Sequence, residues 1–131
     1  SMDSNVVVLK MFPGISEKVV DSILSIEGLK AVVLETFGMG NTPTAPWFLQ
    51  ALKRASEKHI LIVNVTQCAG GSVDMQKYKS GALLLNAGVV SGHDSTTEAA
   101  LTKLMYLFGM GYDTNQVRSY MACSLKGEVH A

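Results

Sequence analysis

Three short apolar runs, separated by amphipathic stretches, most constrain how this chain can fold. The runs lie at residues 5–9, 31–34 and 60–65 and are rich in β-branched side chains. Short continuous apolar runs are typical of strands that are buried on both faces. Between them, apolar residues recur at helical spacing over 19–26 and 48–55. This alternation predicts βαβ units with right-handed crossovers, and hence a parallel sheet covered by helices.

The second half of the chain continues the pattern less regularly. We expect a long loop over 66–80, a short buried helix over 82–85 and a short fourth strand over 87–90. Ser95 and Glu98 match a capping box at the start of a further helix, with Asp94 as an alternative cap. A last helix is expected from Asp113 or Thr114. The predicted fold class is α/β, a three-layer α/β/α arrangement around about four parallel strands.

Composition excludes several classes of function. A chain of 131 residues is expected to form one domain with a substantial core. Formal net charge is zero and the arginines, Arg54 and Arg118, lie on separate predicted helices, so no nucleic-acid partner is expected. No apolar run reaches the roughly 18 residues of a membrane span. Ser1, which precedes Met2, is interpreted as a tag remnant.

The two cysteines, Cys68 and Cys123, are far apart and have no metal-ligand spacing. We therefore expect no metal site, and a reduced, cytoplasmic protein. A catalytic Cys68 supported by His93 and Asp94 remains an alternative, since sequence does not show whether these groups meet in space. Packing is the favoured interpretation of Cys68.

The turn over 35–43 is the first candidate ligand site. It follows the second predicted strand, and ligands of parallel α/β sheets bind beyond the carboxyl ends of strands. Gly38 and Gly40 allow a sharp bend, and Asn41 then offers an amide with both donors and an acceptor. A dinucleotide fingerprint would need a third glycine where Pro43 stands. No nucleophile has a base at a suitable spacing, so the residues predict ligand contact without a self-sufficient catalytic set.

Three segments together, 35–43, 64–75 and 87–101, resemble the C-terminal domain of bacterial type I (cytoplasmic) L-asparaginase. The resemblance covers nearly the whole chain and implies a flavodoxin/Rossmann-like fold. It implies an enzyme that hydrolyses L-asparagine to L-aspartate and ammonia without a metal or organic cofactor. The threonine nucleophile of this family belongs to an N-terminal domain that the chain lacks. The resemblance therefore implies that residues 1–131 contain no catalytic residue and are inactive alone.

The same resemblance implies where substrate and effector would bind. Asn41, with Gly40 and Thr42, would contact the substrate of a neighbouring subunit, in a dimer or tetramer. Cys68 and Glu35 match positions near an effector pocket for asparagine. Glu35 departs from the allosteric members, which carry arginine there, and a glutamate would repel a carboxylate that an arginine binds.

Two other functions remain open at this point. The chain could belong to the amidase subunit of a tRNA-dependent amidotransferase, which shares the asparaginase-like fold. It could also be a non-catalytic, flavodoxin-like or receiver-like binding module. A receiver needs acidic residues clustered at strand ends, whereas the strand ends here supply Glu35 and Thr66.

Overall fold

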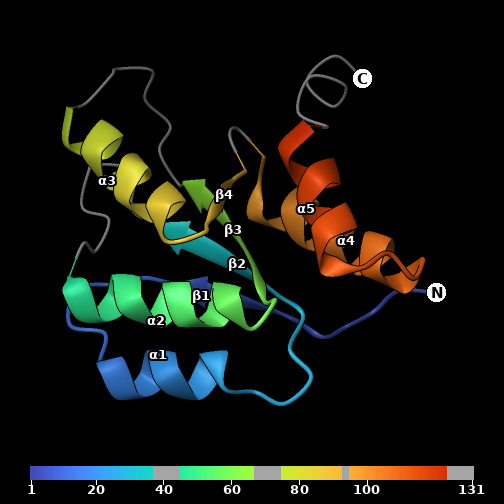
Figure 1. Cartoon of the computed structure of the whole chain (residues 1–131), viewed down its shortest axis with the longest axis horizontal. Helices are drawn as coiled ribbons and strands as arrows, with labels where there is room; N and C mark the ends of the chain where they lie inside the picture. Colours follow the sequence, from blue (N-terminus) through green and yellow to red (C-terminus); the bar gives the residue numbers. More distant parts are fainter. Residues whose placement is uncertain (37–44, 67–74, 93–94, 124–131) are drawn as a thin grey trace.

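Four parallel strands form the centre of the molecule, and their order in the sheet follows their order in the chain (Figure 1). The computed structural model describes residues 1–36, 45–66, 75–92 and 95–123. The strands are β1 (Val6–Lys10), β2 (Ala31–Thr36), β3 (Leu61–Thr66) and β4 (Val90–Ser91). Each strand pairs with its neighbour in parallel, which confirms the predicted sheet.

The helices that connect successive strands all cover one face of this sheet. They are α1 (Glu17–Leu24), α2 (Pro46–Glu57) and α3 (Met75–Asn86). Crossovers of one hand place their helices on the same face when strand order does not reverse, which accounts for this arrangement. Pro46 occupies the first turn of α2, where an N–H would have no partner within the helix.

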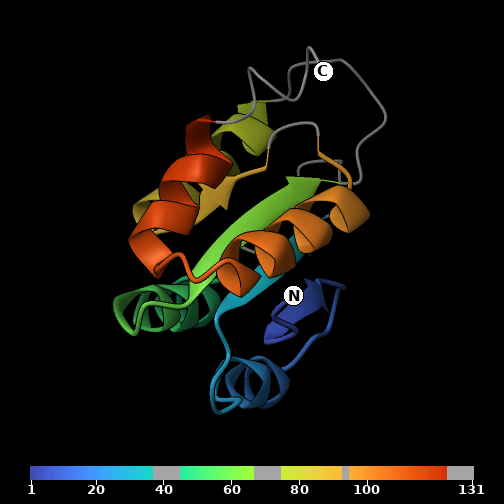
Figure 2. The same cartoon turned by 90° about the vertical axis from the view of Figure 1, so that its right-hand side faces the viewer.

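Two helices that follow the last strand cover the opposite face. They are α4 (Thr97–Gly109) and α5 (Thr114–Cys123), and Figure 2 shows α4 crossing in front of the sheet. The molecule therefore has the predicted three-layer α/β/α architecture. No helix in the described ranges is both long and apolar enough to cross a bilayer.

The side chains of β2 alternate between two hydrophobic cores. Val32 and Leu34 pack in the core beneath α1, α2 and α3. Ala31 and Val33 pack in the core beneath α4 and α5. All four side chains are fully buried. Burial on both faces explains why this strand reads as an uninterrupted apolar run rather than as an alternating one.

Two predicted boundaries in the second half are wrong. Helix α3 begins at Met75, so residues 75–80 are helical although the prediction placed them in a loop. The segment lacks a regular apolar stripe, but its Met, Gln and Lys residues are intrinsically good helix formers. Strand β4 begins only at Val90, because the amides of Ala87 and Gly88 donate to carbonyls in the last turns of α3.

The predicted cap of α4 is also corrected. The N-cap is Thr96, whose hydroxyl accepts a hydrogen bond from the amide of Ala99 at 3.0 Å. Ser95 instead takes part in a turn, since its amide donates to the carbonyl of Gly92 at 3.0 Å. The N-cap of α1 is Ser16, whose side chain accepts a hydrogen bond from the amide of Val19.

Candidate functional site at the carboxyl edge of the sheet

The carboxyl edge of the sheet brings the ends of three strands together with the start of α4. Thr36 of β2 pairs with Thr66 of β3, and Asn64 pairs with Ser91 of β4. The first turn of α4 begins beside the end of β3 (Figure 2). Parallel strands present their ligand sites at this edge. The strand order does not reverse within this sheet, so no reversal point marks a ligand site. The polar side chains at this edge mark it as a candidate site instead.

Glu35 is the candidate site residue that the structure describes. It is the penultimate residue of β2 and is half-buried. Its carboxylate Oε2 accepts a hydrogen bond from Oγ1 of Thr97, at 2.7 Å, across a sequence separation of 62 residues. Thr97 is the first residue of α4, where the partial positive charge of the helix N-terminus favours a nearby carboxylate.

Asn64 makes a second polar contact at this edge. Its amide nitrogen Nδ2 donates to the carbonyl of Leu34 at 3.0 Å and to Oγ1 of Thr36 at 3.1 Å. Thr36 is 1% exposed, so this contact gives its hydroxyl a partner in place of water. The pair therefore satisfies polar groups inside the sheet and ties β2 to β3.

The other candidate residues lie outside the described part of the chain. Gly40, Asn41 and Thr42 fall within 37–44, and Cys68 falls within 67–74. The alternative partners of Cys68, which are His93 and Asp94, are also outside it. The catalytic alternative for Cys68 is therefore untested, and the roles of the candidate residues stay predictions.

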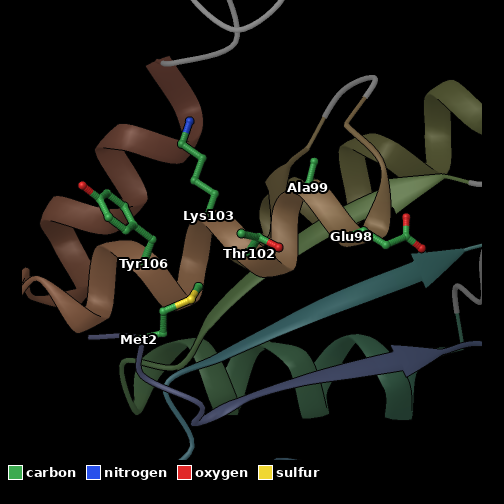
Figure 3. Close-up of a pocket in the computed structure, with 6 residues that line it drawn as sticks. All are labelled: Met2, Glu98, Ala99, Thr102, Lys103 and Tyr106. Atoms are coloured by element: carbon green, nitrogen blue, oxygen red, sulfur yellow. The ribbon is translucent and has the colours of Figure 1, made fainter.

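The described side chains form a shallow, open depression on the outer surface of α4. Its volume is about 610 Å³, and it is lined by Met2, Glu98, Ala99, Thr102, Lys103 and Tyr106. Five of these side chains come from α4 and Met2 comes from the N-terminal segment (Figure 3). Broad, open and set on the outside of a helix, this depression lacks the enclosure typical of a small-molecule site.

The described side chains offer contacts rather than a reaction centre. The hydroxyl of Thr36 accepts a hydrogen bond from the amide of Asn64, and an amide does not act as a base. In the ranges that the structure covers, no three His, Cys, Asp or Glu side chains are grouped as metal ligands.

Sequence reasoning missed Asn64 and Thr97. Asn64 could have been noticed, because a single amide within an otherwise apolar strand needs a buried hydrogen-bond partner. Thr97 carries no such signal, since a threonine in the first turn of a helix is common and its partner is 62 residues away.

Comparison with known proteins gives a consistent result. Residues 5–121 match the family described as the glutaminase/asparaginase C-terminal domain. The chain is 44% identical over 122 residues to L-asparaginase 1 of Escherichia coli K12, a match that covers 93% of the chain and 36% of that protein. It superposes on the crystal structure of L-asparaginase I from Vibrio cholerae with a TM-score of 0.80 and 42% identity. That superposition covers 95% of the chain and 37% of the other protein.

Relatives with other names share the same region. The chain is 45% identical over 130 residues to the mouse 60 kDa lysophospholipase, covering 98% of the chain and 23% of that protein. It is 35% identical over 128 residues to one component of the glutamyl-tRNA(Gln) amidotransferase of Methanobrevibacter smithii, covering 98% of the chain and 29% of that component. The chain thus spans about a third or less of the length of these relatives.

Proposed function

Since the chain belongs to the glutaminase/asparaginase C-terminal domain family, we propose that it is the C-terminal domain of an L-asparaginase. The whole enzyme would hydrolyse L-asparagine to L-aspartate and ammonia. The observation that carries this proposal is the match to L-asparaginase 1, which extends over 93% of the chain. A solved L-asparaginase I with a TM-score of 0.80 supports it independently.

In this proposal, the nucleophile lies in a preceding domain and the described residues serve as its support. Residues 1–131 would form one domain that is inactive alone and acts in the cytoplasm. No organic or metal cofactor is part of the proposed reaction.

The substrate contacts of this domain would come from Gly40, Asn41 and Thr42. We propose that they reach the active site of a neighbouring subunit in a homodimer or homotetramer. An amide such as that of Asn41 binds a zwitterionic amino acid through both donors and acceptors without changing the net charge of the site.

Glu35 and Cys68 form the candidate effector site for asparagine. The Glu35 side chain accepts a hydrogen bond from Thr97, and a glutamate repels the carboxylate of an incoming asparagine that an arginine would bind. We therefore expect a hyperbolic dependence of turnover on asparagine concentration. An effector role for Glu35 would be supported if the wild-type enzyme showed a sigmoidal dependence of turnover on asparagine and Glu35→Ala made that dependence hyperbolic.

Ammonia release tests the main proposal. The full-length enzyme is expected to release ammonia from asparagine, whereas the 131-residue chain alone is expected to release none. In the full-length enzyme, Asn41→Ala should lower kcat/KM for asparagine by about tenfold or more, through the loss of the proposed hydrogen bond to the substrate. Asn115→Ala, an exposed asparagine on α5, provides the control. Turnover by the isolated chain, or an unchanged kcat/KM in Asn41→Ala, would contradict the proposal.

The amidotransferase component is the second candidate, and the relative from Methanobrevibacter smithii is the observation that favours it. The two candidates differ in their partners. A component of an amidotransferase would co-purify with a second, different chain and would release ammonia in the presence of charged tRNA. Parallel assays with asparagine, glutamine and a lysophospholipid would separate the activities that the relatives' names denote.

A further inference from the structure

Helix α4 carries few charges for a helix on the outside of a sheet. Its 13 residues include two charged side chains, Glu98 and Lys103, whereas the eight residues of α1 include three. A surface helix normally presents one apolar stripe to the core and polar side chains to water. The core stripe of α4 already consists of four buried side chains, which are Ala100, Leu104, Leu107 and Phe108. Apolar side chains outside this stripe therefore have no role in the core of the domain.

Three large side chains of this kind lie together on the outer side of α4. Tyr106 is 55% exposed and Met110, one turn further on, is 53% exposed. Residues four apart are neighbours on a helix surface. Met2 is also exposed, and it lines the shallow depression together with Tyr106 (Figure 3). Met2, Tyr106 and Met110 form what we call the α4 patch, and tyrosine and methionine are side chains in which protein interfaces are enriched.

The N-terminal segment is fixed along the same helix. The amide of Asp3 donates a hydrogen bond to the carbonyl of Met105 at 3.0 Å. The backbone of Ser1 and Met2 passes so close to Gly109 that a Cβ added there would overlap it. The chain therefore enters the domain across the C-terminal half of α4, next to the α4 patch.

A protein of the proposed kind has most of its chain before this entry point. The matched family is a C-terminal domain, and the match covers 36% of L-asparaginase 1. In the proposed function, the preceding domain joins the chain at residue 1 and hence beside the α4 patch. Two domains that are joined by a linker meet at a high effective concentration, so a contact of modest area is enough to hold them together.

We propose that the α4 patch is the surface on which the preceding domain of the same chain docks. Interfaces between domains of one chain combine apolar and polar side chains, and Glu98, Thr102 and Lys103 supply polar ones beside the patch. The shallow shape of the depression suits a protein surface better than a small molecule, which binds in an enclosed site. This inference rests on the proposed function only in that it needs a domain before residue 1.

Hydroxyl-radical footprinting measures whether the patch is covered, because these radicals oxidise exposed tyrosine and methionine rapidly. Tyr106 and Met110 should react about fivefold more slowly in the full-length protein than in the 131-residue chain, as side chains do that enter the core of an interface. Leu85 of α3 is the control, since it is 69% exposed and α3 covers the opposite face of the sheet. Its reactivity should change by less than about twofold. Equal reactivity of Tyr106 and Met110 in the two proteins would overturn the proposal.

A photo-cross-linker identifies what covers the patch. Tyr106→p-benzoylphenylalanine in the full-length protein keeps an aromatic side chain and, when irradiated, bonds to a neighbouring C–H group. We expect a cross-link to a peptide that precedes residue 1, in a product that keeps the mass of one chain on a denaturing gel. Leu85→p-benzoylphenylalanine should give no such cross-link. A product of doubled mass would assign the patch to a second copy of the chain, and a cross-link confined to residues 1–131 would leave it without the proposed occupant; either result refutes the proposal.

Tyr106→Arg tests whether the patch holds the two domains together. In the 131-residue chain, this change of an exposed side chain should alter the unfolding equilibrium constant by less than about twofold. In the full-length protein, docking would bury a guanidinium in place of a phenol ring, so Met110 should return to within about twofold of its reactivity in the 131-residue chain. Leu85→Arg should leave Met110 as protected as in wild type. Undiminished protection of Met110 in Tyr106→Arg would contradict the role of the patch.

None of these measurements depends on catalytic activity, so the two proposals fail separately. If the full-length protein releases ammonia and Tyr106 stays as reactive as in the 131-residue chain, docking is refuted and the proposed function stands. If Tyr106 is protected and cross-links to the preceding domain but no ammonia is released, the proposed activity is refuted and docking stands.

Discussion

The two ends of the sheet are closed in different ways. At the carboxyl edge, half-buried or buried side chains bind one another, as Glu35 does with Thr97 and Thr36 with Asn64. At the amino edge, the ion pair of Asp3 and Lys30 lies toward solvent, with 45% of the lysine side chain exposed. The ammonium of that lysine also lies 5.6 Å from the ring centroid of Phe108.

This difference indicates where polar side chains are costly to remove. When one partner of a hydrogen bond between buried groups is removed, the other partner stays buried without a hydrogen bond or contact with water. A solvent-exposed ion pair is replaced by water, and typical exposed pairs contribute little to stability. We therefore expect substitutions at the carboxyl edge to have the larger effects, in the descending order of the predictions that follow.

Gly92→Ala should be the most destabilising of these changes, by about 3 kcal/mol. Gly92 follows β4, and its amide donates to the carbonyl of Asn64 at 2.7 Å. A Cβ at this position would lie 2.9 Å from that same carbonyl oxygen and 2.9 Å from Cγ1 of Val65. Chemical denaturation would measure the loss. Gly81→Ala is the matched control, because a Cβ there meets nothing within 4 Å and alanine favours the helix.

Asn64→Ala should destabilise the chain by about 2 kcal/mol, because it removes the hydrogen bonds from the Asn64 amide to the Leu34 carbonyl, the Thr36 hydroxyl and the Val65 carbonyl. Urea denaturation of the variant beside Asn86→Ala, an exposed asparagine on α3, would test this. Equal effects of the two substitutions would contradict the importance given to the carboxyl edge.

Gly88→Ala tests the amino edge, where we expect a smaller loss of about 1 to 2 kcal/mol. Gly88 precedes β4 with φ of 96°, and an added Cβ would meet the side chain of Ser56. Gly111→Ala has the same backbone strain, with φ of 90°, but no atom within 4 Å. The difference in Tm between the two variants measures the effect of the contact with Ser56. Adding Ser56→Ala to the Gly88→Ala variant should reduce that difference.

Asp3→Asn should have the smallest effect, below about 1 kcal/mol at neutral pH and smaller still in high salt. The hydrogen bond from Lys30, followed by that from the Asn5 amide, holds the pKa of the Asp3 carboxyl below its usual 3.8. A lowered pKa contributes stability that is present above pH 3.8 and is lost as pH falls through the folded-state value. Thermal unfolding of wild type and Asp3→Asn should therefore differ at pH 7 and converge in strong acid.

Much of the fold follows from local sequence, but the side-chain contacts at the carboxyl edge do not. Strands β2 and β3 were predictable because burial on both faces requires uninterrupted apolar runs. Strand β1 was predicted on the same ground, but it lies at the edge of the sheet and its Val8 is exposed. The start of α3 at Met75 was not, since its first turns lack the apolar stripe on which the prediction relied. The bond of Glu35 to Thr97 depends on sheet register and on the placement of a helix 62 residues later. No local pattern contains that information.

The strand order has a consequence for how the chain folds as it is synthesised. Every strand pairs with the one made just before it, so β1 to β4 and the first three helices can assemble in order of emergence. The second face of the sheet, with Val33 and Val63, stays exposed until Leu104 and Val117 have been translated. A nascent chain that ends near Ser91 should therefore bind an apolar dye such as ANS, and one that extends through α5 should not.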